Sequence, residues 1–335
     1  MFKKDDDVKL IAEIGGNHEG DFNYALELLY LAIDAEVDSI KFQIYSGDTL
    51  VNERVDKDRK EHFDRFTFSS DKYKKIASIC KSNNVDFSAS IWNKAQLEEF
   101  DDFLSFYKIG SGDLTAYPLI ESHCKKGKPI ILSTGLSTLE EVKDTIDFIC
   151  KCNPIYRNED MLCIMQCTSS YPTPDRELNL EVIRTYQEEF DYSIGFSSHS
   201  TNPYALDYSI ALGARVLEFH FTDKREGKEF RDHKVSLTKA DVLDLKTRIP
   251  FLLNSLGSSS KHPTESEITS DHINSFRRAA YPNKHIPKGN TVSIEDFIFL
   301  RPQEGLPANS VYNVLGKKSL RDLEPMEPIS VEDFG

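Results

Sequence analysis

The chain has 335 residues, enough for one large domain with a small one or for two domains of ordinary size. Its 39% hydrophobic and 29% charged residues are typical of a soluble globular protein, and a formal net charge of −14 argues against binding to nucleic acid or to an anionic membrane. No apolar run reaches the roughly 20 residues that span a bilayer, and the first residues lack the apolar core of a signal peptide, so we expect a cytoplasmic protein. The six cysteines show no metal-binding or redox spacing, which predicts reduced, mostly buried thiols.

Short apolar segments alternate with amphipathic ones over the first three quarters of the chain, and they predict strands and helices respectively. The predicted strands are Lys9–Gly16, Ser39–Tyr45, Asp86–Ile91, Phe106–Ser111, Pro129–Thr134, Met161–Cys167, Tyr192–Ser200 and Val216–Thr222. The predicted helices are Asn23–Glu36, Asp71–Ser82, a short one from Lys94, Pro118–Lys126, Thr138–Cys150, Asn179–Phe190, Pro203–Ala211 and Thr238–Leu253. Strands that alternate with helices over about 250 residues predict an α/β fold of the (β/α)₈ TIM-barrel type, with a doubly wound open sheet as the alternative.

Polar side chains recur at the carboxyl ends of the predicted strands, which form the catalytic face of such a barrel. Glu13, Lys41, Gln43 and Glu218 lie inside segments that are otherwise apolar. Strands covered on both faces are nearly continuous in apolar residues, so charges that point into a barrel must be paired or bind a ligand. The alternative for each residue is an outward position under a covering helix.

Two histidines, His199 and His220, each end an apolar run, and a predicted helix separates the two runs. A strand, helix and strand in succession make the two strands parallel neighbours, so both imidazoles should emerge at one edge. That geometry suits two ligands of a divalent metal. The alternative is a pair of unrelated histidines near strand ends.

The chain changes in character near Gly257. A serine-rich linker and a polar segment from Ser266 to Arg278, predicted to be helical, separate the barrel from a tail rich in proline and glycine. We therefore predict a barrel over residues 1–256, a linker with a connecting helix over 257–279, and a small domain over 280–335. Residues 286–297 and 323–334 resemble each other, which suggests a pseudo-symmetric domain with little regular structure.

A set of motifs gives the whole chain a resemblance to the sialic acid synthase (N-acetylneuraminate synthase) family, including legionaminic and pseudaminic acid synthases. The motifs are Ala12-Glu-Ile-Gly-Gly-Asn-His-Glu-Gly20, Lys41-Phe-Gln43, Lys108-Ile-Gly-Ser-Gly-Asp113, Gly127-Lys-Pro-Ile-Ile-Leu-Ser-Thr-Gly135, Cys167-Thr-Ser-Ser-Tyr-Pro172, Gly195-Phe-Ser-Ser-His199, Glu218-Phe-His-Phe221 and Asp232-His-Lys234. The tail resembles the family's antifreeze-like (SAF) domain. The resemblance implies condensation of phosphoenolpyruvate with an N-acylated amino sugar to a nine-carbon 2-keto-3-deoxy acid and phosphate.

The resemblance also implies roles for individual residues. His199 and His220 would hold a divalent metal, manganese by preference and magnesium or cobalt otherwise, which polarises the sugar aldehyde. Phosphoenolpyruvate would be bound by Lys41, Ser111, Lys128, Ser133, Ser169 and Ser197. The sugar would be bound by Glu13, Gln43, Tyr171, Asp232 and Arg301, with Glu13 also transferring a proton or activating water. Members of the family form domain-swapped homodimers, so we expect Arg301 to act on the partner's barrel.

Some residues depart from the family pattern and leave the acceptor sugar open. The third strand reads Phe87-Ser-Ala-Ser-Ile-Trp92 in place of a Phe-x-Ser-Thr-Pro-Phe sequence, and Gln166 replaces a histidine. The loop between Tyr45 and Ser70 is shorter than in the sialic acid enzymes. We therefore expect an acceptor that leads to an acid of the sialic, legionaminic or pseudaminic type, or an aldehyde of another length. A metal-dependent hydrolase and a catalytically silent sugar-binding relative are the alternatives from other classes.

Overall fold

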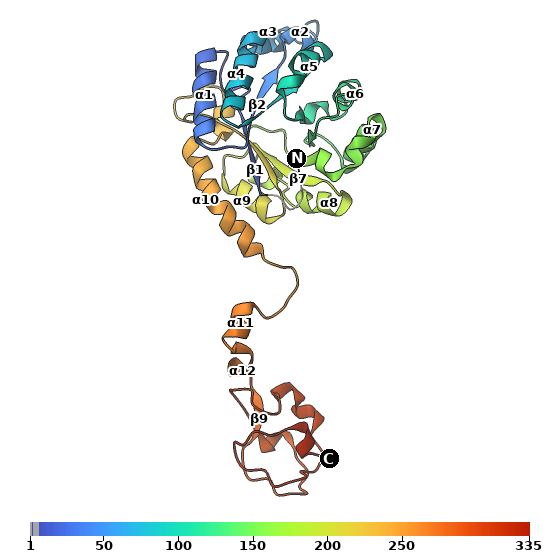
Figure 1. Ribbon diagram of the computed structural model, residues 1–335, viewed down its shortest axis with the longest axis vertical. Helices are drawn as coiled ribbons and strands as arrows, with labels where there is room; N and C mark the ends of the chain where they lie inside the picture. Colours follow the sequence, from blue (N-terminus) through green and yellow to red (C-terminus); the bar gives the residue numbers. More distant parts are fainter. Residues whose placement is uncertain (1, 3–6) are drawn as a thin grey trace. The chain divides into compact units, whose positions relative to one another are not determined.

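The computed structural model describes residues 2 and 7–335, and their contacts divide the chain into two compact units, Met1–Gly257 and Ser258–Gly335. The first unit is a closed barrel of parallel strands in which each strand pairs with the next along the chain and β8 pairs with β1 (Figure 1). This confirms the predicted (β/α)₈ barrel. The doubly wound alternative is wrong, because an open sheet would leave two unpaired edges.

The helices surround the strands in the order that the sequence predicts (Figure 1). The barrel strands are β1 Lys9–Glu13, β2 Ser39–Ile44, β3 Asp86–Ile91, β4 Tyr107–Ile109, β5 Ile130–Ser133, β6 Leu162–Cys167, β7 Ser193–Ser198 and β8 Val216–His220. The helices of this unit are α1 Phe22–Asp34, α2 Gly47–Leu50, α3 Lys57–Phe66, α4 Ser70–Ser82, α5 Lys94–Phe100, α6 Tyr117–Cys124, α7 Leu139–Cys152, α8 Val182–Glu189, α9 Tyr204–Ala211 and α10 Lys239–Leu256.

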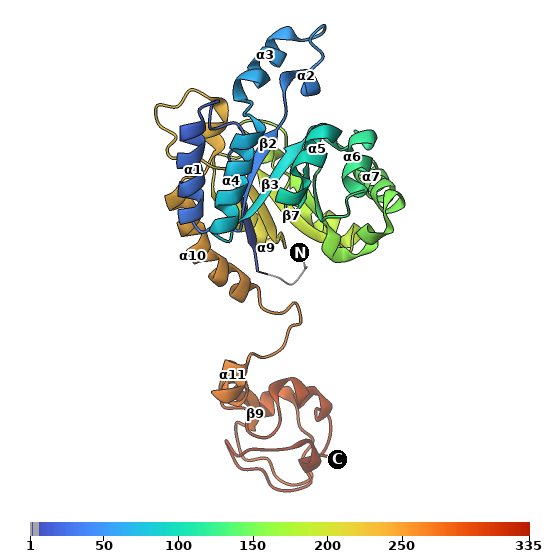
Figure 2. The same ribbon diagram turned by 45° about the horizontal axis from the view of Figure 1, so that its top comes forward.

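Helices α2 and α3 occupy the segment that the sequence predicts to be a polar loop, and Figure 2 shows them projecting beyond the strands. The Asp56 carboxylate caps α3 by accepting a hydrogen bond from the Arg59 backbone N–H at 3.0 Å. Only Phe66 of α3 is buried. Hydrophobic periodicity could not reveal this helix, because it has no continuous apolar face.

Side chains inside the barrel form two levels. Ile11, Ile131 and Val216 belong to a buried apolar cluster that also contains Phe2 and Phe106, whose rings lie 5.7 Å apart in an edge-to-face contact. Side chains two residues further along a strand point to the same face. Glu13, Ser133 and Glu218 therefore lie directly above this apolar level, toward the carboxyl ends of the strands, and all three are buried.

The second unit contains short helices α11 Glu265–Thr269 and α12 His272–Phe276 and an antiparallel pair of strands, β9 Ala279–Pro282 and β10 Phe297–Leu300. The predicted single helix is interrupted because Asp271 adopts a left-handed conformation, with φ 52°.

The two similar sequence segments of the second unit have the same local structure. The backbone N–H of Ser293 donates to Asp296 Oδ2 at 2.8 Å, and that of Ser330 donates to Asp333 Oδ2 at the same distance. Each serine begins a 3₁₀ turn. The two similar segments therefore fold into the same capped turn, which agrees with the predicted pseudo-symmetry at this point of the domain.

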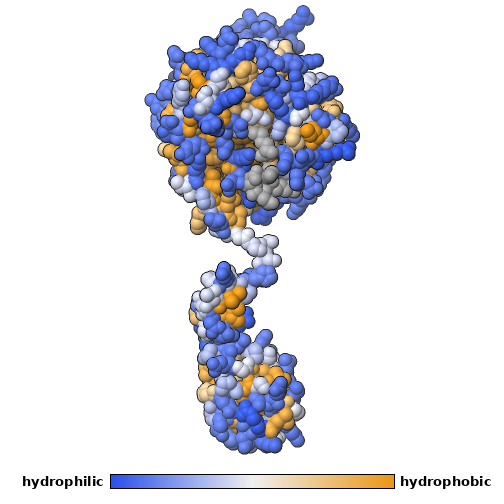
Figure 3. All heavy atoms as spheres, in the orientation of Figure 1, coloured by the Kyte–Doolittle hydropathy of each residue, from blue (hydrophilic) through white to orange (hydrophobic). Residues whose placement is uncertain are grey.

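The surface agrees with the composition. Hydrophilic residues predominate on the face in Figure 3, with scattered hydrophobic patches. Within residues 2 and 7–335, no helix combines the length and apolar character that a bilayer crossing requires. All six cysteines are free thiols, and Cys80, Cys124, Cys163 and Cys167 are buried. The predicted reduced, mostly buried thiols are confirmed.

Candidate active site

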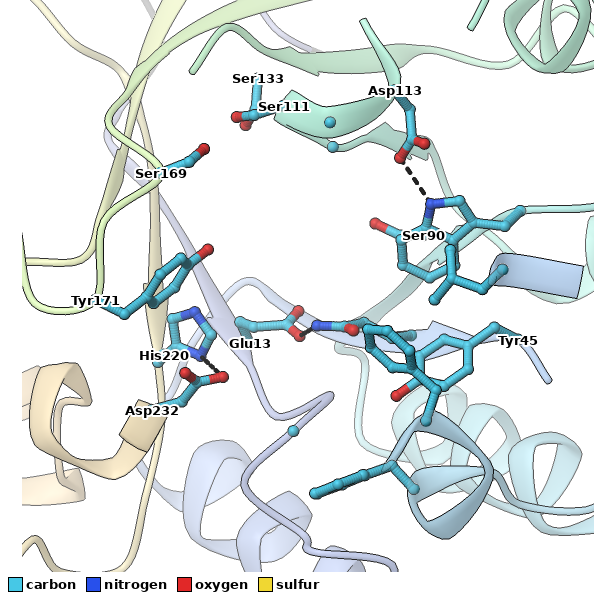
Figure 4. Close-up of a pocket in the computed structure, with 18 of the residues that line it drawn as sticks. Glu13, Tyr45, Ser90, Ser111, Asp113, Ser133, Ser169, Tyr171, His220 and Asp232 are labelled. Carbon is cyan, nitrogen blue, oxygen red and sulfur yellow. Dashed lines mark hydrogen bonds and ion pairs between the residues drawn. The ribbon is translucent and has the colours of Figure 1, made fainter. Parts of the chain in front are cut away.

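A cavity of about 1060 Å³ opens at the carboxyl ends of the strands, and every strand of the barrel contributes a side chain to its wall. Figure 4 shows several of these side chains pointing toward one another across the cavity. The predicted site residues that line it are Glu13, Lys41, Gln43, Ser111, Ser133, Ser169, Tyr171, Ser197, His199, His220 and Asp232. The barrel thus brings together side chains from distant parts of the sequence.

Two ammonium groups share one buried carboxylate at the base of the cavity. Lys41 Nζ lies 3.9 Å from Glu218 Oε2, and Lys108 Nζ lies 3.5 Å from Glu218 Oε1. Burial opposes ionisation of Glu218, but the two lysines outweigh this effect and lower its pKa to about 2. Lys41 also forms an ion pair with Glu13; burial lowers the pKa of Lys41, but Glu13 and Glu218 together raise it. The base of the cavity therefore carries fixed charges of both signs.

Hydroxyl groups surround these charges. Lys108 Nζ donates to Ser133 Oγ at 2.8 Å, and Ser197 Oγ donates to Glu218 Oε1 at 3.0 Å. A Cβ atom on Gly135 would lie 2.6 Å from Ser169 Oγ and 2.8 Å from Ser111 Oγ, so only glycine fits between the two serines. Ser111, Ser133 and Ser169 are grouped at one end of the cavity in Figure 4. Hydroxyls and ammonium groups supply the donors that a phosphate or carboxylate needs.

His199 directly follows β7 and His220 ends β8, and these strands are parallel neighbours, as predicted. The ring centres of the two histidines are 5.4 Å apart. His199 Nδ1 lies 2.8 Å from the Thr168 carbonyl oxygen, so this nitrogen carries a proton and donates it to that oxygen. Burial lowers the pKa of His199, but its contacts with the Cys167 thiol and the Thr168 carbonyl outweigh burial and raise the pKa. His220 Nδ1 is buried 3.9 Å from Asp232 Oδ2, and none of the described residues forms a hydrogen bond with it.

Metal binding at this point would use these two imidazoles. Burial lowers the pKa of His220, which favours the neutral form that binds metals. No group of three or more His, Cys, Asp or Glu side chains suited to a metal occurs among the described residues. A metal here would therefore need ligands from substrate or water in addition to the pair.

The comparisons with known proteins agree with this geometry. Residues 28–261 match the NeuB family, and residues 277–335 match the SAF domain. The chain belongs to the NeuB family. The N,N'-diacetyllegionaminic acid synthase of Legionella pneumophila is 30% identical to this NeuB chain, over 92% of the chain and 89% of the relative.

Two other relatives of this NeuB chain have the same level of identity. The N-acetylneuraminate-9-phosphate synthase of Homo sapiens is 30% identical, over 96% of the chain and 91% of the relative. A pseudaminic acid synthase of Campylobacter jejuni is 30% identical over 99% and 98%. The crystal structure of N-acetylneuraminic acid synthetase from Leptospira borgpetersenii, in complex with citrate, matches with a TM-score of 0.73 and 26% identity, over 80% of this chain and 91% of that one.

Of the site residues predicted in the barrel of this NeuB chain, Lys128 does not line the cavity. It precedes β5 and so lies at the amino end of the barrel, where its Nζ donates to the Leu104 carbonyl at 3.0 Å and lies 3.3 Å from Asp101 Oδ1. The assignment of Lys128 to phosphoenolpyruvate is therefore corrected. Lys108, which lies within β4, supplies the second ammonium group instead.

The cavity is also lined by residues for which the sequence predicted no role in binding: Lys108, Glu218, Trp92 and Asp113. Lys108 and Glu218 were recognisable as charges inside apolar strands. Trp92 Nε1 donates to Asp113 Oδ2 at 2.7 Å, and both residues lie within motifs that sequence analysis had singled out. Arg301 belongs to the second unit, where its guanidinium group lies 5.5 Å from the centre of the Phe276 ring.

Proposed function

We propose that this protein condenses phosphoenolpyruvate with the open-chain aldehyde of an N-acylated amino sugar. The products are a nine-carbon 2-keto-3-deoxy acid of the sialic, legionaminic or pseudaminic type and phosphate. The observation that carries the proposal is one cavity that combines two buried ammonium groups, a group of serine hydroxyls and a pair of histidines, in a chain related to synthases of these acids. An alternative is the same chemistry on a different sugar aldehyde.

Phosphoenolpyruvate fits the base of the cavity. Its phosphate and carboxylate would accept hydrogen bonds from Lys41, Lys108 and the hydroxyls of Ser111, Ser133, Ser169 and Ser197. Both lysines are buried, so an anion would meet them with little competing water. Glu218 holds the two lysines in place before the anion arrives.

The aldehyde would lie between the phosphoenolpyruvate and the histidines. A divalent metal, manganese by preference and magnesium or cobalt otherwise, would be held by His199 and His220 and would polarise the aldehyde oxygen. Carbon 3 of phosphoenolpyruvate then bonds to the aldehyde carbon, and the aldehyde oxygen takes a proton to become a hydroxyl. Water adds to carbon 2, and the bond from carbon 2 to the phosphate oxygen breaks.

Glu13 is placed to handle the protons of this reaction. Its Oε1 accepts hydrogen bonds from Gly15 N–H at 3.0 Å and Gln43 Nε2 at 2.8 Å, and its other oxygen pairs with Lys41. These contacts orient the carboxylate toward the base of the cavity. We propose that Glu13 activates the water that adds to carbon 2, while Gln43, Tyr171 and Asp232 bind the sugar.

The proposal is tested by measuring phosphate release from phosphoenolpyruvate against a panel of hexosamine derivatives with added Mn²⁺. Release that depends on one of the sugars, with a nine-carbon keto acid identified by mass spectrometry, supports it. A protein that binds sugars but releases no phosphate with any of them is a silent relative, and the proposal is then wrong.

We propose further that the working unit is a homodimer in which the SAF domain of one chain closes the barrel of the other. The resemblance to the family is the support for this arrangement. A closed barrel mouth would also keep bulk water from the reacting carbon 2. Arg301 would then contact the acyl group of the sugar in the partner's barrel.

A further inference from the structure

The loop that follows β8, over residues 221–237, carries three residues of the cavity wall: Phe230, Arg231 and Asp232. Within this loop, Arg231–Val235 form a 3₁₀ turn. Asp232 is buried, although its neighbour Arg231 is exposed. Loops are more mobile than the strands that they join, so the position of this carboxylate depends on what holds the loop.

The Asp232 carboxylate is turned toward the histidine pair. Its Oδ2 lies 3.9 Å from His220 Nδ1 (Figure 4), and its Oδ1 accepts a hydrogen bond from Arg231 Nε at 3.0 Å. A Cβ atom on Gly16 would lie 3.1 Å from Asp232 Oδ2 and 2.8 Å from Phe230 Cε1, so the loop after β1 approaches these side chains closely. A displacement of about 1 Å would therefore alter what the carboxylate binds.

One side chain from the loop after β1 fastens both ends of the loop after β8. Asn17 Nδ2 donates to the Phe221 carbonyl oxygen at 2.8 Å and to Ser236 Oγ at 2.7 Å. Ser236 Oγ in turn donates to the Asp232 carbonyl oxygen at 2.7 Å. These directions are fixed, because a carbonyl oxygen only accepts hydrogen bonds and the serine hydroxyl has a single proton to donate. Asn17 thus reaches the backbone of Asp232 through one intervening hydroxyl group.

These two side chains are buried outside the cavity. Asn17 is fully buried and Ser236 is 1% exposed, and neither of them lines the cavity. Because water has little access to such positions, it would not readily replace a hydrogen bond that is lost there. Any effect of Asn17 on a substrate must therefore pass through the residues that it holds.

A second attachment joins the same two loops. The fully buried His233 ring lies between Thr222 Oγ1, which is 2.7 Å from Nδ1, and Glu19 Oε1, which is 3.0 Å from Nε2. Glu19 belongs to the loop after β1. His233 directly follows Asp232 but does not line the cavity. The two neighbours therefore differ in their contacts, since the carboxylate faces the cavity and the imidazole anchors the loop.

We propose that Asn17 is a positioning residue, which sets the place of the Asp232 carboxylate beside the histidine pair through Ser236. This inference rests on the proposed function, in which Asp232 binds the acceptor sugar. The phosphoenolpyruvate end depends on Lys41 and Lys108, which lie on strands and not on this loop. Asn17 therefore governs the affinity for the sugar and leaves the affinity for phosphoenolpyruvate unchanged.

The test measures kcat and both KM values of the full-length protein by phosphate release with Mn²⁺. The acceptor is the sugar of the hexosamine panel with the highest kcat/KM, starting with N-acetylmannosamine. Ser236→Ala removes the hydrogen bond to Asp232 and leaves the bond from Asn17 to Phe221 in place. It should raise the KM for the sugar by about tenfold, and the KM for phosphoenolpyruvate should stay within about twofold. Asn17→Ala should change the two KM values in the same way.

Ser209→Ala is the matched control. Ser209 is also fully buried, and its Oγ donates to a backbone carbonyl, that of Leu206, at 2.7 Å. It belongs to α9 and does not line the cavity. Loss of this hydroxyl should leave both KM values unchanged, and thermal melting shows whether each variant folds.

A double-variant comparison tests whether the effect passes through Asp232. The initial slope of rate against sugar concentration gives kcat/KM for the sugar even in slow variants. In an Asp232→Ala background the carboxylate is absent, so adding Ser236→Ala should change this quantity by less than about twofold. A role of Ser236 that is independent of Asp232 would give the same change in both backgrounds.

Each outcome supports or overturns the inference. An unchanged KM for the sugar, an equal rise in both KM values, or equal effects of Ser236→Ala in the two backgrounds overturns it and leaves the proposed synthase function intact. If Asn17→Ala fails to fold, Ser236→Ala and its control decide. Absence of phosphate release with every aldehyde removes the proposed function and the inference together.

Discussion

Lys108 reaches across the interior of the barrel from β4 to Glu218 on β8, where its Nζ lies 3.5 Å from Oε1. Lys41 approaches the same carboxylate from the other side, at 3.9 Å from Oε2. In the free protein Glu218 therefore lies between two buried ammonium groups, and Glu13 forms a further ion pair with one of them, Lys41. A bound anion such as phosphoenolpyruvate would balance part of the positive charge of Lys41 and Lys108.

This relationship predicts that Glu218→Gln destabilises the free protein more than the bound one. Breaking a buried ion pair typically costs about 3–5 kcal/mol, because the remaining charge is left without a partner. Saturating phosphoenolpyruvate should restore stability by supplying negative charge to Lys41 and Lys108. Thermal melting with and without the ligand should show a larger ligand-induced rise in Tm for the variant than for the natural protein. Equal rises in both proteins would contradict this account, and Glu99→Gln, at an exposed ion pair, is the control.

The histidine pair predicts metal dependence. Replacing His199 or His220 by Ala would remove one of the two proposed protein ligands, so activity should fall by about a hundredfold or more while the barrel still folds. Mn²⁺ binding measured by electron paramagnetic resonance should weaken in both variants, and circular dichroism should remain unchanged. His262→Ala, at an exposed position, is the control. Full activity of both variants in the presence of a chelator would show that no metal acts here.

The order of bond formation predicts the fate of the bridging oxygen of phosphoenolpyruvate. If water adds to carbon 2, the bond that breaks joins carbon 2 to the bridging oxygen. An ¹⁸O label at this position should leave with phosphate, where ³¹P NMR detects it as an isotope shift. Label found in the keto acid instead would mean that water attacks phosphorus, and the proposed addition to carbon 2 would then be wrong.

Because His18 is buried with a lowered pKa, we expect the protein to lose stability in weak acid. This imidazole is fully buried, with its ring centre 4.4 Å from that of Phe68, and burial lowers its pKa from 6.5 to about 4. The unfolded chain therefore takes up a proton near pH 6.5 that the folded chain accepts only near pH 4. Stability from the neutral, buried imidazole is therefore fully present above pH 6.5 and is lost as the pH falls toward 4. The free energy of unfolding should decrease by about 2 kcal/mol between pH 7 and pH 5 from this group.

Urea unfolding at pH 7 and pH 5 measures that loss. In His18→Asn the side-chain oxygen can still accept the Gly20 N–H, which donates to His18 Nδ1 at 3.0 Å in the natural protein, but asparagine does not titrate in this range. The variant should therefore lose less stability between the two pH values. An unchanged pH dependence would assign the acid sensitivity to other groups.

Sequence patterns could locate most of the cavity because the carboxyl ends of parallel strands converge. Glu13, His199 and His220 were found because their strands are strongly apolar and have clear ends. Lys128 was misplaced because a motif assigns a residue to a segment without fixing which end of the strand it occupies. The contact between Tyr45 and Phe63 in the cavity wall was not predicted, since Phe63 lies on a helix without an apolar face and meets Tyr45 only through the tertiary fold.

The proposed exchange of SAF domains predicts that Arg301 acts in trans. Arg301→Ala chains should lack a contact to the sugar, and His220→Ala chains should lack a metal ligand, so each protein alone should have little activity. In a mixed dimer with exchanged domains, one site combines an intact barrel with an intact Arg301, and the other site carries both defects. Random mixing should therefore restore about a quarter of the natural activity.

The control for this experiment mixes Arg301→Ala chains with chains that carry both substitutions, because no combination of these two gives an intact site. If each SAF domain closed its own barrel, every site in the first mixture would keep one defect, and the mixture would stay as inactive as its components. Subunit exchange must be verified by native mass spectrometry of the mixture, since dimers that never exchange would give the same result. Restored activity in the first mixture, with none in the control, would establish a site shared between two chains.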